Sequence, residues 1–95
     1  MNNEEALALL EHELSGYRDI AYVDLVSQVS KGPFTSERVG ASGVTYQIEI
    51  EIIWDGPAGG NIHVFGAIDD GGWWSSFSPL NRGFLKAPDG SFVGE

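Results

Sequence analysis

The sequence predicts a single α+β domain in which two N-terminal helices pack on one face of a four-stranded antiparallel meander sheet. Three observations lead to this fold. Apolar side chains recur at helical spacing in the first third of the chain, apolar and polar side chains alternate in the middle, and glycine clusters separate the alternating stretches. The apolar faces of helices and sheet bury each other by stacking in two layers. The 95 residues contain no linker that would divide them, so residues 1–95 are expected to form one domain.

The first helix is predicted to begin after Asn2. Asn2 and Glu5 have the spacing of an N-terminal capping pair, which offers a polar side chain to the free amides and an acid near the positive end of the helix dipole. The helix is expected to end near Ser15 and Gly16. Its apolar stripe consists of Leu7, Leu10, Leu14 and Tyr17.

A second, shorter helix is predicted between Asp19 and Pro33. Asp19 is its expected N-cap. At the C-terminal end, Lys31 places a basic residue in the last turn, Gly32 can adopt the left-handed C-cap conformation, and Pro33 ends the helix. The apolar residues of this segment follow the i, i+3, i+4, i+7 spacing of one helix face, and they are Tyr22, Leu25, Val26 and Val29.

Three strands are predicted before residue 70. A short strand from Phe34 to Val39 leads through a turn at residues 40–43 into the longest alternating run, Val44 to Asp55. The glycine-rich loop at residues 56–60 then returns the chain into a third strand. If the pairing of these two strands shifted by one residue, the apolar side chains of one strand would turn to the solvent face. The expected register therefore pairs Trp54 with Ile62, Ile52 with Val64, Ile50 with Gly66 and Ile48 with Ile68.

The fourth strand is predicted from Trp73 to Phe77, after a tight turn at residues 70–72. A two-residue turn would direct Trp73 and Phe77 to the core and Trp74 to the opposite face, whereas a three-residue loop with a bulge would exchange the two tryptophans. Beyond Phe77, Pro79 and Gly83 are expected to interrupt regular structure. A turn is predicted at residues 87–91, with a short closing strand at residues 92–93.

Composition limits the classes of function. Fourteen acidic and five basic residues give a formal net charge of -9, which argues against nucleic acid and anionic membranes as partners and is compatible with a basic protein. Solubility is the alternative explanation of this charge. The sequence has neither a signal-peptide pattern after Met1 nor an apolar run of the roughly 18 residues that a membrane helix needs, so a cytoplasmic location is expected.

Patterns for catalysis or metal binding are weak. The chain has no cysteine, and its two histidines are the only imidazole bases that could activate a serine nucleophile. None of its serines lies in a nucleophile-elbow sequence. A metal at His63 would need a cross-strand carboxylate such as Glu51, because Asp69 lies too far along the same strand. The stretches GPAGG and DDGG match neither a phosphate loop nor an EF-hand. We therefore expect a protein that is not an enzyme and has no cofactor.

The candidate site is the sheet face that points away from the helices. Aromatic side chains surrounded by acids are typical of a protein recognition surface, and we expect this face to bind a basic protein as an inhibitor or immunity-type protein does. Three alternatives stay open: residues 80–93 cover the face, a small-molecule or hydrolytic site forms around His63, or the face forms a homodimer. The residues of the expected face are Glu49, Glu51, His63, Phe65, Asp69 and Trp74.

The C-terminal half also resembles a group of small, uncharacterised bacterial proteins. The similarity extends over residues 43–95, with a looser match over the second predicted helix. It rests on the stretches GVTYQIEIEIIWD and IDDGGWWSSFSPLNRGFLKAPDGSFVGE. The resemblance implies no activity, substrate or catalytic residue.

Overall fold

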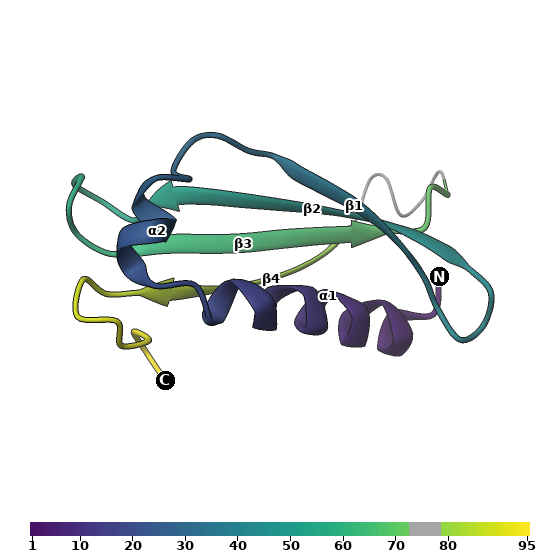
Figure 1. The fold of residues 1–95 in the computed structure, drawn as a ribbon. Helices are drawn as coiled ribbons and strands as arrows, with labels where there is room; N and C mark the ends of the chain where they lie inside the picture. The colour runs from purple at the N-terminus through teal and green to yellow at the C-terminus, as the bar shows by residue number, and fades with distance from the viewer. Residues whose placement is uncertain (73–78) are drawn as a thin grey trace.

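A computed structural model describes residues 1–72 and 79–95 and has the predicted two-layer α+β architecture (Figure 1). Helices α1 (Asn3–Arg18) and α2 (Tyr22–Val26) form one layer. The other layer is an antiparallel meander whose strands follow the order β1-β2-β3-β4. These strands are β1 (Phe34–Val39), β2 (Thr45–Trp54), β3 (Ile62–Asp69) and β4 (Leu80–Lys86). No helix within the described ranges is both long and apolar enough to cross a membrane.

The hairpin of β2 and β3 has the predicted register. Trp54 pairs with Ile62 at the loop end and Ile48 pairs with Ile68 at the other end, with the two intermediate pairs as expected. The backbone N–H of Asp55 donates to the carbonyl of Asn61 at 2.8 Å and closes the glycine-rich loop. Trp54 is an inward side chain that is only partly buried. The other large inward side chains of the hairpin are 0–1% exposed, and they are Tyr46, Ile48, Ile50, Ile52, Ile62, Val64 and Ile68.

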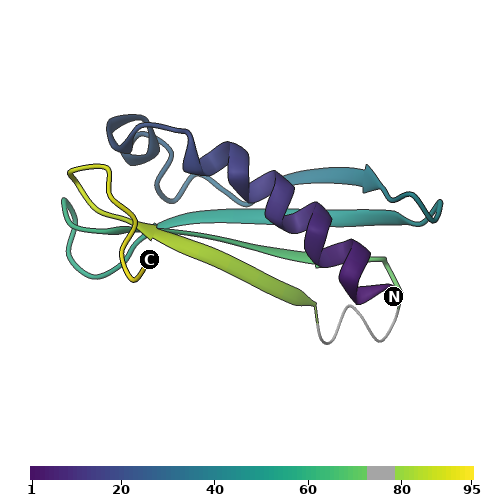
Figure 2. The same ribbon diagram turned by 90° about the horizontal axis from the view of Figure 1, so that it is seen from below.

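Helix α1 begins as predicted and extends two residues further than predicted. The Asn2 side chain accepts a hydrogen bond from the N–H of Glu5 at 3.0 Å. The helix passes through Gly16, which has no left-handed conformation, and ends at Arg18. The buried face of the helix packs against β3 and β4, and the helix lies obliquely across the sheet (Figure 2). The buried side chains on this face are Ala6, Leu10 and Leu14.

The predicted boundaries of the second helix were wrong. Asp19 is the C-cap of α1, and the N-cap of α2 is Ala21, which makes no side-chain capping bond. Helix α2 ends at Val26, and the left-handed conformation belongs to Ser30 rather than to Gly32. The N–H of Ser30 donates to the carbonyl of Ile52 at 2.9 Å, so this backbone donor bonds to β2 instead of continuing a helix.

The strand beside β3 lies in a segment that was predicted to be irregular. The strand that pairs with β3 is Leu80–Lys86, and the predicted strand Trp73–Phe77 lies outside the described residues. Phe84 and Lys86 therefore occupy inward positions on the edge strand. Gly83 does not interrupt this strand, because it lies opposite Phe65 where the two backbones approach too closely for a side chain.

The chain beyond β4 lies on the helix side of the sheet. A turn at residues 87–91 forms as predicted, whereas the predicted closing strand is a single bridge between Phe92 and Lys86. The Phe92 ring packs edge-on against Phe84, with centroids 5.6 Å apart. The Arg18 guanidinium lies 4.9 and 4.7 Å from the centroids of these two rings and donates two 2.8 Å hydrogen bonds to the Glu95 carboxylate.

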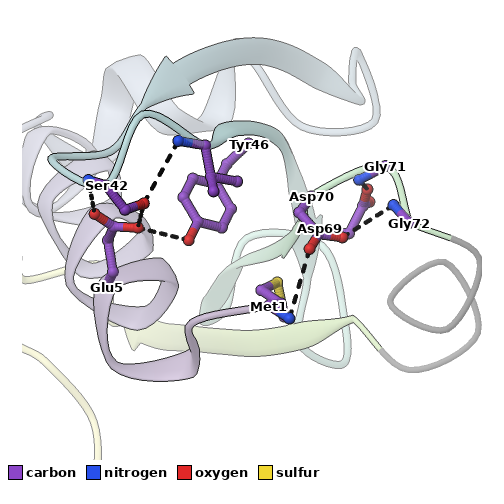
Figure 3. Close-up of polar contacts among 9 residues, drawn as sticks. Met1, Glu5, Ser42, Tyr46, Asp69, Asp70, Gly71 and Gly72 are labelled. Atoms are coloured by element: carbon purple, nitrogen blue, oxygen red, sulfur yellow. Dashed lines mark hydrogen bonds and ion pairs between the residues drawn. The ribbon is translucent and has the colours of Figure 1, made fainter.

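The Glu5 carboxylate joins the first turn of α1 to the β1–β2 turn (Figure 3). Its Oε1 accepts from the backbone N–H of Ser42 at 2.9 Å, and its Oε2 accepts from the Ser42 hydroxyl at 2.6 Å and the Tyr46 hydroxyl at 2.7 Å. Gly40 lies beside the carboxylate, where any Cβ would collide with it. The carboxylate thus satisfies the polar end of Tyr46, a residue that is 0% exposed.

These contacts predict a pH-dependent stability. The hydrogen bond from the Ser42 hydroxyl, followed by those from the Ser42 N–H and Tyr46, lowers the pKa of Glu5. A lowered folded-state pKa contributes stability above the unfolded value of about 4.3, and this contribution disappears as the pH falls through the folded-state pKa. We expect Glu5→Gln to lower the free energy of unfolding at pH 7 and to flatten its decline below about pH 5. Urea denaturation at a series of pH values measures both effects.

The matched control is Glu4→Gln, which removes the same charge from an exposed position on the same helix turn. The control is expected to keep the acid slope of the unmodified protein. If Glu5→Gln and Glu4→Gln gave the same pH profile, the proposed role of the Glu5 carboxylate would be wrong.

Candidate protein-binding face

The outer face of the sheet is the side opposite the two helices, both of which pack on the buried side chains of the inner face (Figures 1 and 2). The strand register brings the outer side chains into rows across the sheet. One row contains Glu51 and Phe65, and the next contains Ile53, His63 and Leu85. Further along are Glu49 beside Ala67 and Asn81, and Glu37 beside Gln47 and Asp69.

One end of the outer face is apolar. We define the outer apolar cluster as Ile53, His63, Phe65 and Leu85, which share this face on three adjacent strands. Ile53 is 37% exposed, and the other three side chains are partly exposed. The rings of His63 and Phe65 lie side by side with centroids 4.8 Å apart and a tilt of 38°. This cluster therefore offers a partner a largely apolar surface with two adjacent rings.

Carboxylates border this cluster. Glu51 lies opposite Phe65 and diagonally from His63, as predicted, and Glu49 lies opposite Ala67. Within residues 1–72 and 79–95, neither glutamate forms a salt bridge. Glu37 accepts a 2.8 Å hydrogen bond from the Gln47 amide, which leaves its charge uncompensated.

Four of the five basic residues of the chain lie away from the outer face. Three arginines pair with carboxylates on the helix side or at the C-terminus: Arg18 with Glu95, Arg38 with Glu13 and Arg82 with Glu11. Lys86 is buried, and Lys31 is exposed in the loop before β1. No outward position of the four described strands carries lysine or arginine. The outer face is therefore more acidic than the net charge alone implies.

Asp69 does not join the other predicted site residues. It lies opposite Gln47, six residues from His63 and thus about 20 Å along the strand. Its Oδ1 accepts from the Gly71 N–H at 2.8 Å, and the Asp70 Oδ1 accepts from the Gly72 N–H at 2.9 Å (Figure 3). The two aspartates thus support turn geometry. In the described part of the chain, no three acidic or histidine side chains could share a metal ion.

Two predictions concerned which residues lie on the outer face or cover it. Trp74, which was expected on this face, lies outside the described residues. The alternative that residues 80–93 cover the face was wrong, because Leu80–Lys86 is a strand of the sheet and Phe92 packs against Phe84 on the helix side. Cover from the described C-terminal segment is thus excluded.

Sequence reasoning missed Ile53 and Leu85 as members of the outer apolar cluster. Ile53 interrupts the polar side of the β2 alternation, and the register that was predicted correctly would have assigned it to the outer face beside His63. Leu85 could not be found in this way, because its strand was predicted elsewhere. The signal for Leu85 is its position next to Phe84, which is buried on the inner face, because neighbouring residues of a strand point to opposite faces.

The outer face thus combines an apolar cluster with unpaired glutamates, and this chemistry is what indicates its function. The resemblance of residues 43–95 to small bacterial proteins stays a prediction. Comparison with known proteins adds no relative, because no protein-family model, curated protein or solved structure matches this chain.

Proposed function

We propose that this protein is a non-enzymatic binding module that holds a basic protein against its outer face. The observation that supports the proposal is the pairing of the outer apolar cluster with Glu49 and Glu51, whose charges no cation of the described residues compensates. Opposite charges steer two proteins together and fix their orientation, and a desolvated apolar centre supplies most of the binding free energy. The arrangement suits an inhibitor or immunity-type protein that covers a basic surface.

The geometry of the face supports a particular partner chemistry. Glu49 and Glu51 are two residues apart on β2, so their Cα atoms are separated by about 6.6 Å along the strand. A matching surface presents lysine or arginine side chains at a similar spacing. Beside them it presents an apolar or aromatic side chain, which packs on Phe65 and Ile53. Arginine is the better match, because its guanidinium binds a carboxylate through two hydrogen bonds and also stacks on an aromatic ring.

The same charges argue against a homodimer through this face. A two-fold interface would bring the acidic rim of one copy against that of the other, and like charges in an interface are repulsive. We therefore expect a monomer at low ionic strength, where repulsion is screened least. Size-exclusion chromatography with light scattering measures this state. A dimer at low salt that Phe65→Ser converts to monomer would contradict this prediction and favour self-association.

A defined probe can test the acidic and apolar parts of the face together. The peptide Lys-Trp-Lys carries the proposed partner chemistry, and Glu-Trp-Glu is the control with the same aromatic ring. In NMR titrations at low salt, the basic peptide should shift the amide signals of Glu51, His63 and Phe65, and added salt should reverse these shifts. Shifts centred on another surface, or equal shifts with both peptides, would count against the proposal.

Glutamine substitutions then separate specific contacts from net charge. Glu49→Gln with Glu51→Gln should abolish the response to Lys-Trp-Lys. Glu4→Gln with Asp19→Asn changes the net charge by the same amount at exposed positions on the helix side, and should leave the response intact. An equal loss in both double variants would show attraction by overall charge rather than a binding face.

A further inference from the structure

A pocket of about 390 Å³ lies on the helix side of the sheet, away from the outer face. The end of α1, helix α2, β1 and β2 contribute its walls. Its apolar surface comes from Ile20, Phe34 and Ile52, and its polar lining comes from Tyr17, Asp24, Ser27 and Gln28. This volume falls within the range of about 300–1,000 Å³ that is usual for small-molecule sites.

The pocket follows from how the helices cover the sheet. Helix α1 packs mainly on β3 and β4, and α2 packs mainly on β3, so the helices cover the inner side of β1 less closely. Helix α2 has five residues, and the chain beyond it turns back to β2 at Ser30. Phe34 is consequently only partly buried, although it packs against the core.

Three polar groups that line the pocket are available to a ligand. The Ser27 hydroxyl is already used, since it donates to the backbone carbonyl of Asp24 at 2.6 Å. Within the described ranges, the Asp24 carboxylate, the Gln28 amide and the Tyr17 hydroxyl form no side-chain hydrogen bond and no ion pair. Burial, and secondly the charge of Glu13, raise the pKa of Tyr17, so this hydroxyl stays neutral.

We infer that this pocket binds a small organic ammonium ion with an apolar body. The Asp24 carboxylate would receive the ammonium group, and the pocket lining includes the aromatic residues Tyr17 and Phe34, a residue class whose rings attract cations. The apolar body packs on Ile20 and Phe34, which are partly exposed. No lysine or arginine lines the pocket, so the carboxylate has no internal competitor and an anionic ligand finds no partner.

This inference does not rest on the proposed function of the outer face. The two sites share no residue, lie on opposite sides of the sheet and attract different ligands, a folded protein and a small cation. An ammonium ion can therefore bind whether or not a basic protein occupies the outer face.

The test uses three compounds with a phenyl ring on a short chain. These are 2-phenylethylamine, which is a cation at pH 7, 2-phenylethanol, which is neutral, and 3-phenylpropionate, which is an anion. NMR titration of the whole chain should show millimolar or tighter binding of the amine, with shifts at Asp24, Gln28 and Phe34. The alcohol should bind at least about tenfold more weakly, and the anion should not bind.

Substitutions identify the carboxylate responsible. Asp24→Asn should weaken binding of the amine by about tenfold and leave the alcohol unchanged, whereas Asp19→Asn removes the same charge outside the pocket lining and should change little. Because Asp24 is exposed, the variant is expected to fold, and thermal unfolding verifies this. The inference is overturned if the amine does not bind, if the three compounds bind equally, or if the two variants behave alike.

Discussion

Replacing Lys86 with methionine is expected to lower the free energy of unfolding by about 2–3 kcal/mol. Lys86 is 7% exposed, and its Nζ donates to the carbonyls of Arg18 at 2.9 Å and Ile20 at 2.7 Å. The ammonium also lies 5.2 Å from the centroid of the Phe92 ring. Methionine retains an unbranched apolar stem that is one atom shorter and leaves both carbonyls without this donor. Since α1 ends at Arg18, the lysine attaches the end of the helix to β4.

Urea denaturation of Lys86→Met measures the loss, and Lys31→Met is the matched control. Lys31 is exposed in the loop before β1, so its replacement removes the same charge and is expected to change stability by less than about 0.5 kcal/mol. A Lys86→Met protein as stable as the control would show that the buried ammonium contributes little net stability.

Gly83→Ala is the second substitution with a large expected effect, a loss of about 2–3 kcal/mol. A Cβ at this position would lie 2.7 Å from the Val64 carbonyl oxygen, 2.8 Å from the Phe65 Cβ and 3.1 Å from the Phe65 Cα. Because these are atoms of β3 close to its backbone, the collision cannot be relieved by a side-chain rotation. The pairing of β4 with β3 has to shift instead.

The same substitution in α1 provides the control. A Cβ at Gly16 meets no atom within 4 Å, and alanine is the better helix former, so Gly16→Ala should raise stability by about 0.5–1 kcal/mol. The two alanine variants are thus expected to change stability in opposite directions. Gly83→Ala with unchanged stability and unchanged NMR shifts for Phe65 would contradict the close approach of β3 and β4.

The part of the fold that could be predicted is the part in which two independent signals agree. In the β2–β3 hairpin, the loop composition and the apolar alternation specify one register, and both the pairing and the buried face followed from it. The N-cap of α1 was predictable because the contact between Asn2 and Glu5 is local. The acidic border of Phe65 followed from the same register, since Glu51 lies directly opposite.

The incorrect predictions concern segments whose structure depends on distant contacts. Residues 80–86 were not predicted as a strand, because strand propensity is low in a segment with a glycine and an arginine. The glycine of β4 is required by the close backbone of β3, a contact that no local pattern reveals. Lys86 likewise owes its buried position to the carbonyls at the end of α1, 66 and 68 residues earlier in the chain.

The candidate sites differ in the same way. The outer face could be predicted because strand alternation separates inward from outward side chains. The pocket could not be predicted, because its lining residues Tyr17, Asp24 and Phe34 come from α1, α2 and β1. The space between these elements depends on where α2 ends. The α2 boundary was predicted several residues too late, so no cavity beside it was expected.

The most direct measurement of the proposed function is a comparative capture experiment. The tagged protein, the variant Glu49→Gln with Glu51→Gln, and the control Glu4→Gln with Asp19→Asn are each incubated at low salt with extract of the source organism. Bound proteins are then identified by mass spectrometry and quantified. The proposed function predicts one basic protein in stoichiometric amount on the unmodified chain and on the control, absent from the Glu49 and Glu51 variant and released by high salt. Equal capture by all three proteins, or no stoichiometric partner for any of them, would contradict a basic-protein binding role for the outer face.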